Sequence, residues 1–368
     1  MKGLFKLGTI AGIGIFIHWT FTLLIAFIIF INYRNGQNSI QIAWSVLFIL
    51  CIFITVLLHE LGHALTAKRY NIKTKDITLL PIGGIARLER LPENPLEELV
   101  VAIAGPLVNF ALAFITLFFI EIPKDTEELL VLMSSGINAN NFFFNFYIVN
   151  LTLGVFNLIP AFPMDGGRVL RALLSFRMNR NTATQIAARV GQFIALCFIL
   201  IGIVTNPILI LIGLFVIFSA QIETESVEFK NLLKGYTVRD VVMKEYQTIE
   251  ADDTIKKAIA ILLESEHRKF LVTQNNKLVG TLNKNQIIRA LSEKGEEEYI
   301  YNVMDRSLVY IDINTQLEKV IEQLYEKKGS VLIVNENNQL AGILDADNLS
   351  EFILINSIKA KQNHANEY

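Results

Sequence analysis

The sequence predicts a polytopic α-helical membrane domain followed by a soluble α/β module, and two observations carry this prediction. Charged residues are unevenly distributed, because residues 1–220 contain only 26 of the 68 Lys, Arg, Asp and Glu residues in the 368-residue chain. The first part also contains long apolar runs, whereas the second contains an internal αβ repeat. The formal net charge of −2 gives no indication of a nucleic-acid partner.

The apolar runs predict six transmembrane helices. A helix needs about 20 predominantly apolar residues to cross a bilayer. Thr205-Asn206-Pro207 divides the last run into two spans, of which the second is expected to be rather short. The expected spans lie at Gly12–Ile31, Ala43–Ala67, Leu99–Ile120 and Phe142–Phe162, with two more within Val190–Ala220.

The distribution of basic residues predicts the orientation of these spans. With the N-terminus in the cytoplasm, the segments on the inner side carry twelve Lys and Arg residues, and the outer loops carry two. Cytoplasmic loops of membrane proteins are enriched in Lys and Arg. We therefore expect the N-terminus and the soluble module to lie in the cytoplasm.

A short segment between the second and third spans has a different pattern. Residues Ile72–Arg90 alternate polar and apolar side chains, and Gly83 and Gly84 interrupt this alternation. Such a pattern predicts short strands with a turn. We therefore expect a small β segment at the membrane surface, beside the second span.

The second span contains the motif HELGH, in which His59 and His63 are four residues apart and Glu60 follows the first histidine. On a helix this spacing places both imidazoles on one face, where two nitrogens can bind one Zn²⁺ at about 2.0–2.1 Å. Glu60 can then reach water whose pKa the metal lowers to about 7. Ionisable groups in mid-bilayer cost about 2.5–3.5 kcal/mol, so we expect these groups to face the protein interior. The alternative is that the three residues cap the end of a span at the interface.

A catalytic zinc site needs a third protein ligand, and the best candidate is distant in the sequence. Asp76 lies in a strand-like segment and Glu89 in a basic loop, so neither is suitable. Asp165 follows two prolines that break the preceding helix, and Gly166 and Gly167 allow the backbone to turn. A carboxylate here can face inward, or it can be the N-cap of the helix that follows. The segment alone leaves both interpretations open.

Four segments carry a family resemblance: HELGH in the second span, LLPIGG after it, AGPLVN in the third span and FNLIPAFPMDGG (Phe156–Gly167). Their order, over roughly residues 10–220, resembles the site-2 protease family of intramembrane zinc metalloproteases. The resemblance implies one Zn²⁺ per chain with His59, His63 and Asp165 as its ligands. It also implies that Glu60 is the catalytic general acid and base.

The resemblance implies contacts with the substrate as well. Asn157 and Pro163 match family positions, and the asparagine is implicated in contacting the substrate or an oxyanion. Met164 departs from the leucine of many members, but this position is outside the catalytic set. The strand edge around Gly83 and Gly84 is expected to pair with an unwound substrate segment. A purely structural surface hairpin explains the same pattern.

The soluble part contains two copies of one unit. VVM (Val241–Met243) matches NVM (Asn302–Met304), and NKLVG ending at Gly280 matches NQLAG ending at Gly342. Two copies favour a paired module over a solenoid, and the pattern resembles tandem cystathionine-β-synthase (CBS) domains. The expected organisation is a membrane domain at 1–220, a linker at 221–235, CBS domains at 236–292 and 298–354, and a polar tail at 355–368.

The resemblance to CBS pairs raises the question of an adenine nucleotide. Members that bind one have Ser or Thr near the phosphate and Asp at the ribose, whereas this chain has Asn283 and Gln286 in the first copy and Asp345 and Asn348 in the second. These departures argue against a nucleotide. Any residual site is expected near Asn283 and Lys284. The expected role of the pair is to form a homodimer or a regulatory contact.

Together these features predict a zinc-dependent intramembrane endopeptidase with a cytoplasmic CBS pair. The alternatives are a CBS-regulated transporter or channel, and a protease-like scaffold without activity. Transport would need repeated membrane units and charges along the spans, and the sequence indicates neither. The expected substrate is a single-span membrane protein, such as a membrane-tethered regulator, in a prokaryotic cytoplasmic membrane.

Overall fold

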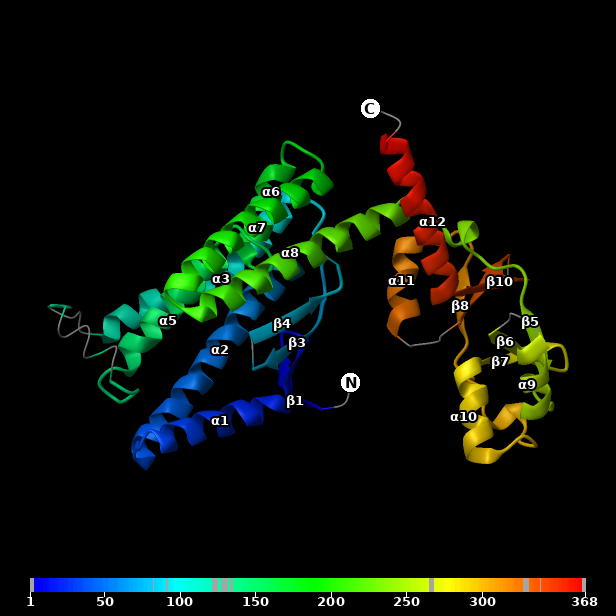
Figure 1. Ribbon diagram of the computed structural model, residues 1–368, viewed down its shortest axis with the longest axis horizontal. Helices are drawn as coiled ribbons and strands as arrows, with labels where there is room; N and C mark the ends of the chain where they lie inside the picture. Colours follow the sequence, from blue (N-terminus) through cyan, green and yellow to red (C-terminus); the bar gives the residue numbers. More distant parts are fainter. Residues whose placement is uncertain are drawn as a thin grey trace. The chain divides into compact units, whose positions relative to one another are not determined.

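The computed structural model describes residues 3–81, 83–90, 92–120, 125–126, 132, 135–264, 268–326, 331–337 and 339–365 (Figure 1). The chain forms two compact units, Met1–Glu225 and Ser226–Tyr368. The first unit is mainly helical with one small sheet, and the second contains two small sheets with helices. This is the predicted class, a helical membrane domain and a soluble α/β module.

A four-stranded sheet in the order β1-β2-β3-β4 accompanies the helices of the first unit. Its strands are β1 (Leu4–Ile10), β2 (Ile13–His18), β3 (Thr74–Leu80) and β4 (Gly83–Leu88). β2 is antiparallel to β1 and parallel to β3, and β3 is antiparallel to β4. The strands expected within residues 72–90 are confirmed, but Gly83 and Gly84 begin β4 and do not form the turn.

The expectation of one helix over Gly12–Ile31 is wrong at its N-terminal end. Residues Ile13–His18 form β2, and α1 runs only from Thr20 to Arg34. Isoleucine at every second position is typical of a strand, since alternate side chains point to the same face. Ile13 packs in a cluster with Leu61, Ala64 and Ile77, so this face of β2 belongs to the core.

Four helices among the described residues are long and apolar enough to cross a membrane: α2 (Ser39–Arg69), α3 (Pro95–Thr116, continued by the 3₁₀ turn Leu117–Phe119), α7 (Arg180–Val204) and α8 (Pro207–Leu233). α1 and α5 (Phe142–Asn157) are shorter apolar helices that overlap the expected first and fourth spans, and α5 ends five residues before the expected Phe162. The count of six spans therefore stays a prediction.

Local sequence signals set the ends of these helices. Asn38 begins α2 with a capping box, and Asn94 caps α3 ahead of Pro95. α7 ends at Val204 and α8 begins at Pro207, so the predicted break is confirmed. α8 has 27 residues, so the last helix is longer than expected because it continues past the apolar run that was expected to form a short span. Residues 221–233 contain no Gly or Pro that would end it earlier.

α6 (Asp165–Ser175) packs closely on the segment that follows α5, because Gly166 and Gly167 in its first turn have no side chains. A Cβ on Gly166 would lie 2.2 Å from the carbonyl oxygen of Ile159, and one on Gly167 would lie 2.8 Å from the backbone nitrogen of Phe162. α3 contacts α2, α5 and α6, and α6 also contacts α7. The start of α6 is therefore held firmly within the bundle.

The second unit consists of two similar halves, each with a three-stranded sheet. The halves are bridged reciprocally, because Met243 of the first pairs with Ile343 of the second and Asp305 of the second pairs with Thr281 of the first. This reciprocity is the pseudo-two-fold arrangement that the repeat predicts. The sheets share one hydrophobic cluster, formed by Leu271, Val331, Ile333 and Ile343.

The elements of the two halves follow the same order. The first half contains 3₁₀ turn Val238–Asp240, β5 (Gln247–Glu250), α9 (Ile255–Glu264), β6 (Lys269–Gln274), β7 (Lys277–Asn283) and α10 (Lys284–Lys294). The second contains 3₁₀ turn Ile300–Asn302, β8 (Val309–Asp312), α11 (Leu317–Glu326), β9 (Val331–Glu336), β10 (Gln339–Asp345) and α12 (Ala346–Ala365). Most of the expected polar tail is therefore helical, and residues 366–368 lie outside the described residues.

Candidate metal centre

His59 and His63 lie on one face of α2, as their spacing predicts. Their Nε2 atoms are 3.1 Å apart, and each is 3.1 Å from Oδ2 of Asp165 at the start of α6. All three residues are buried, with 7%, 5% and 8% of their surface exposed. Two helices thus bring three possible ligand atoms from positions 59, 63 and 165 to one point.

The partners of the other imidazole nitrogens determine which ring nitrogen is protonated. Nδ1 of His63 lies 2.7 Å from the carbonyl oxygen of Val101, which can only accept a hydrogen bond. Nδ1 of His59 lies 2.6 Å from Oδ1 of Asn109. Each Nδ1 therefore donates, and each Nε2 presents a lone pair.

This donor set fits a zinc ion. Two Nε2 lone pairs and a carboxylate oxygen face one another at 3.1 Å, and a metal cation between them would bind all three acceptors. Ligands of a tetrahedral zinc with bonds of about 2.0–2.1 Å are roughly 3.3–3.4 Å apart, close to the observed spacing. Among the residues that the structure describes, His59, His63 and Asp165 form the group of side chains that could hold a metal ion.

The structure decides whether Asp165 is an N-cap residue and whether Asp76 could be a metal ligand. Met164 is the N-cap residue of α6 and Asp165 is its first helical residue, so the N-cap interpretation of Asp165 is wrong. Asp76 forms an ion pair with Arg87, with 2.8 Å between Arg87 Nε and Asp76 Oδ1, so it is not available as a ligand.

The histidines also depend on a glycine that sequence reasoning did not single out. A Cβ on Gly105 of α3 would lie 2.2 Å from Nε2 of His63 and 2.6 Å from Nε2 of His59. Gly105 and Asn109 both belong to the segment AGPLVN, four residues apart and on one face of α3. That segment was the available signal for both residues. Its glycine makes room for the imidazoles, and its asparagine orients one of them.

Glu60 is partly buried on α2, beside the donor group, and strand β4 lies directly against it. A Cβ on Gly84 would lie 2.8 Å from Cγ of Glu60 and 3.0 Å from Cγ1 of Val56. Gly83, with a φ of +141°, enters β4 in a conformation that L-residues rarely adopt. The glycine pair therefore allows the edge strand of the sheet to approach the carboxylate.

The remaining predicted contacts lie near the start of α6 in the chain. Asn157 is the last residue of α5 and is partly buried. Pro163 is exposed in the segment between α5 and α6, two residues before Asp165. The structure gives their places, and their contact with a substrate stays a prediction.

The residues weighed for a nucleotide site are engaged within the protein. Asn283 is the N-cap of α10, and it forms a capping box with Gln286, with distances of 3.0 Å and 2.8 Å. Asp345 accepts from the backbone N–H of Asn348 at 2.9 Å and pairs with Lys269 at 2.6 Å. The charge of Asp345 is therefore balanced by Lys269, from the other half of the pair. The backbone N–H of Lys284 donates to the carbonyl oxygen of Arg268 at 2.9 Å.

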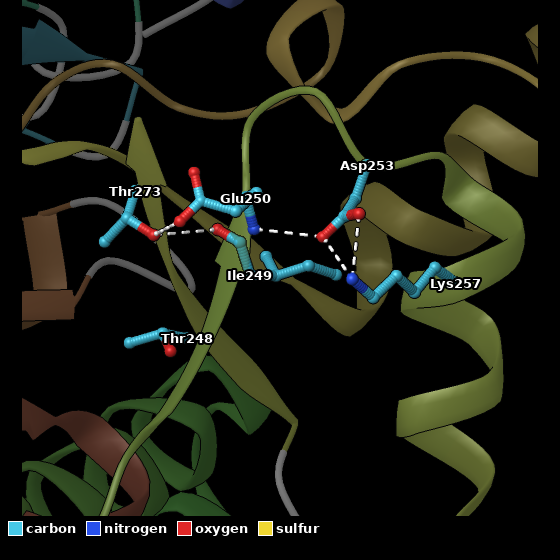
Figure 2. Close-up of a pocket in the computed structure, with 6 residues that line it drawn as sticks. All are labelled: Thr248, Ile249, Glu250, Asp253, Lys257 and Thr273. Atoms are coloured by element: carbon cyan, nitrogen blue, oxygen red, sulfur yellow. Dashed lines mark hydrogen bonds and ion pairs between the residues drawn. The ribbon is translucent and has the colours of Figure 1, made fainter. Parts of the chain in front are cut away.

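Figure 2 shows a surface hollow in the first half of the pair, lined by Thr248, Ile249, Glu250, Asp253, Lys257 and Thr273. Lys257 Nζ lies 2.8 Å from the Asp253 carboxylate, which also accepts from the backbone N–H of Glu250 at 3.1 Å. The hydroxyl of Thr273 donates to Glu250 Oε1 at 2.9 Å. These polar groups satisfy one another, so the hollow adds no second candidate site.

A helical unit with spans of membrane length, a buried His-His-Asp donor set and an adjacent glutamate define the class of a membrane metallohydrolase. The sequence pattern of Peptidase family M50 matches residues 47–201, and that of the CBS domain matches residues 238–293 and 300–355. A zinc metalloprotease of Methanocaldococcus jannaschii is 34% identical over 355 residues, 96% of this chain and 97% of the relative. The chain therefore belongs to peptidase family M50, the site-2 protease family, and carries tandem CBS domains.

Two further proteins are similar to this chain. Stage IV sporulation protein FB of Bacillus subtilis is 28% identical over 256 residues, 66% of this chain and 83% of that protein. A solved structure titled as the site-2 protease from Methanocaldococcus jannaschii is 40% identical, covers 60% of this chain and 95% of that chain, and has a TM-score of 0.43. Members of family M50 are integral membrane proteins, and the helices of this chain agree with a multi-pass arrangement.

Proposed function

We propose that this chain is a zinc-dependent intramembrane endopeptidase that cleaves a single-span membrane protein. The observation that carries the proposal is the triangle of His59 Nε2, His63 Nε2 and Asp165 Oδ2, with 3.1 Å between each pair of atoms. Each imidazole is anchored through Nδ1, so the lone pairs are directed to one point. His59, His63 and Asp165 would hold one Zn²⁺ per chain, which leaves a fourth position open.

The chain's own residues supply the remaining chemistry. When bound, zinc supplies the Lewis acidity that polarises a peptide carbonyl and activates water at neutral pH. Glu60 takes a proton from the attacking water on its carboxylate and returns it to the leaving amine. Burial beside the donor group keeps this carboxylate close to the reacting atoms and limits the access of bulk water.

The sheet provides a way to present the substrate. A peptide bond in a transmembrane helix is shielded by the helix, so a substrate has to unwind before water can attack it. β4 is the last strand of the sheet order and passes Glu60 at Gly84. An unwound segment that pairs with this edge would be held extended beside Glu60. Asn157 and Pro163 are proposed to contact the same segment.

The membership of a peptidase family argues against the transporter or channel alternative. We propose that the N-terminus and the CBS pair are cytoplasmic, in a prokaryotic cytoplasmic membrane, and that the pair forms a homodimer or a regulatory contact. A membrane-tethered regulator already trimmed outside the membrane is a suitable substrate, because only its single span remains to be cut. The inactive-scaffold alternative is decided by experiment.

Metal analysis and a cleavage assay on the purified chain test the proposal. We expect about one zinc per wild-type chain, and His59→Ala, His63→Ala and Asp165→Ala should each lower the occupancy. Glu60→Gln should keep the metal and lower the cleavage rate of a single-span substrate by about 10²–10⁴-fold, because it removes a proton carrier and no ligand. Glu89→Gln, an exposed change outside the donor group, is the matched control.

Three outcomes would contradict the proposal. Near wild-type cleavage by Glu60→Gln would exclude the proposed proton transfer. Full zinc occupancy after replacement of both histidines would exclude the proposed ligands. A wild-type chain that holds zinc but cuts no single-span substrate would support the scaffold alternative.

A further inference from the structure

An ion cluster with a fully buried arginine at its centre joins four helices, α3, α6, α7 and α8. Arg171 of α6 is 0% exposed and Glu98 of α3 is 4% exposed. Nε and Nη2 of Arg171 donate to Oε1 of Glu98 at 2.8 Å and 2.5 Å, and Nη1 donates to Glu223 of α8. Arg171 thus connects α3, α6 and α8 through its planar guanidinium, which suits two carboxylates at once.

The cluster is balanced in charge. Arg180 Nη2 lies 3.3 Å from Oε2 of Glu98, so two arginines face two glutamates. A buried charge that loses its partner is strongly destabilising, because no solvent replaces the lost interaction. The four side chains therefore hold their helices in one arrangement. A change at any member has to be accommodated by the others.

Two connections lead from Arg171 to the metal ligand Asp165. Both residues are on α6, six positions apart, which is about 9 Å along the helix axis. The guanidinium carbon of Arg171 also lies 5.1 Å from the ring centre of Phe162, which is 1% exposed and belongs to the segment just before Asp165. A displacement of the guanidinium would therefore act on Asp165 from both sides.

Helix α8 connects the cluster with the soluble module. α8 continues without interruption from Pro207 to Leu233. Glu223 lies on this helix ten residues before Leu233, and Leu233 is 0% exposed in a hydrophobic core with Val238, Leu317 and Leu344. The helix that ends in the core of the second unit is thus the helix that supplies a carboxylate to Arg171.

We infer that the Arg171–Glu223 ion pair couples the position of α8 to the orientation of Asp165, which makes Arg171 a positioning residue for the metal-binding group. This inference rests on the proposed zinc site and adds a route for its regulation. A movement of α8 that draws Glu223 away leaves Arg171 held by Glu98 alone. Arg171 is then bound by one carboxylate in place of two, so the rotation of α6 about its axis is less restricted. The carboxylate of Asp165 is consequently held less firmly in the direction of the histidines.

Zinc affinity of the full-length chain, measured by competition with a chelator, tests the coupling. Glu223→Gln keeps the side-chain shape and removes the charge, and it should weaken zinc binding by up to about ten-fold, because groups bonded directly to a ligand have effects of about 10–100-fold and Glu223 acts only through Arg171. Glu225→Gln is the matched control, because Glu225 is exposed on the same helix and accepts from Gln221. The visible spectrum of the Co²⁺-substituted chain should change for Glu223→Gln and stay unchanged for Glu225→Gln.

A double-mutant cycle separates coupling from a general loss of packing. If Glu223 acts through Arg171, Glu223→Gln should have little further effect on zinc affinity in an Arg171→Lys background. The lysine keeps the positive charge but lacks the planar fork, so the chain should still fold. Circular dichroism and size-exclusion chromatography check folding of each variant.

The results distinguish this inference from the proposed function. Wild-type zinc affinity and an unchanged cobalt spectrum in Glu223→Gln would overturn the coupling and leave the zinc site intact. Independent, additive effects of the two changes would overturn it as well. A wild-type chain that binds neither zinc nor cobalt would overturn the proposed function itself.

Discussion

Asn109 shows how much of the candidate site depends on single residues outside its motif. It is 1% exposed on α3, and its Oδ1 lies 2.6 Å from Nδ1 of His59. This contact fixes the ring orientation and the tautomer, so the lone pair of Nε2 faces His63 and Asp165. A histidine without such a partner could present either nitrogen, and its affinity for a metal ion would fall.

Asn109→Ala should therefore weaken zinc binding by about 10–100-fold. Chelator competition on the full-length chain measures this effect, and cleavage should fall in parallel at limiting zinc. Asn145→Ala is the matched control, since the Asn145 amide donates to the carbonyl oxygen of Asn141, the N-cap residue of its own helix, at 2.9 Å. Equal zinc affinity in the two variants would show that His59 needs no such anchor.

Lys269 has a comparable position in the soluble pair. Its ammonium lies 2.6 Å from Asp345 and 2.8 Å from Asp347, and the side chains of Lys269 and Asp345 are 13% and 5% exposed. The pair joins the two halves of the module. Asp345 stands where nucleotide-binding members have Ser or Thr near the phosphate, and Lys269 balances its negative charge.

Lys269→Ala should lower the free energy of unfolding of the CBS module by about 3 kcal/mol, because it leaves Asp345 as a buried carboxylate without its cation. Hydrogen exchange followed by mass spectrometry should report faster exchange in β9 and β10. Lys257→Ala removes the exposed partner of Asp253, and it should cost less than about 1 kcal/mol. Similar exchange in both variants would mean that the inter-half ion pair contributes little.

At the scale of elements, β2 and α8 differ most from their predicted forms. Six residues expected to begin a transmembrane helix form a strand, because β3, some 60 residues later, pairs with them. α8 extends past its apolar part and ends at Leu233, which allows one helix to carry Glu223 and to reach the core of the second unit. Both cases show an element defined by partners that are distant in the chain.

The topology of the spans is testable at this scale. In a variant that lacks Cys51 and Cys197, a single cysteine at Asn206, between α7 and α8, should react with an impermeant thiol reagent added outside the cell. A single cysteine at Lys73, just before β3, should react only after the membrane is opened. Labelling of the Lys73 position from outside, with protection at Asn206, would reverse the proposed orientation.

For the whole molecule, one functional question is whether the CBS module can bind a ligand that would regulate the membrane unit. The reciprocal pairing of Met243 with Ile343 and of Thr281 with Asp305 gives the module a pseudo-two-fold axis. Such a module offers two equivalent clefts, but in this chain their polar residues differ. In the first half Asn283 and Gln286 bind each other, and in the second half Asp345 is held by Lys269.

We therefore predict weak or no binding of ATP, ADP and AMP to the full-length chain. A nucleotide would have to break the capping box at Asn283 or displace Lys269 from Asp345, and it would find an uncharged side chain at each ribose position. Isothermal titration calorimetry in detergent measures this. A dissociation constant near 1 μM, about −8 kcal/mol, would show that the module can rearrange to bind a nucleotide.

The sequence by itself determined the features that depend on local physics. The spacing of His59 and His63 determines that both lie on one face of the helix, because the period of an α-helix does not depend on its position in the protein. Pro207 decides the break between α7 and α8, because it lacks an N–H group and restricts the preceding residue. The repeat determines that the soluble part forms two similar halves, since each copy carries the same pattern of apolar residues and turns.

Only the tertiary structure decided the features that depend on distant partners. Asp165 joins the histidines from 102 and 106 residues away, and apart from the family resemblance its segment was equally compatible with an N-cap. Arg171 lies 73 residues from Glu98 and 52 from Glu223, so no spacing connects these charges. The roles of Gly105 and Asn109 depend on the packing of α2 against α3, which brings both residues into contact with the histidines. The physical reason is that burial and ion pairing are set by which elements meet, and this depends on the packing of the whole unit.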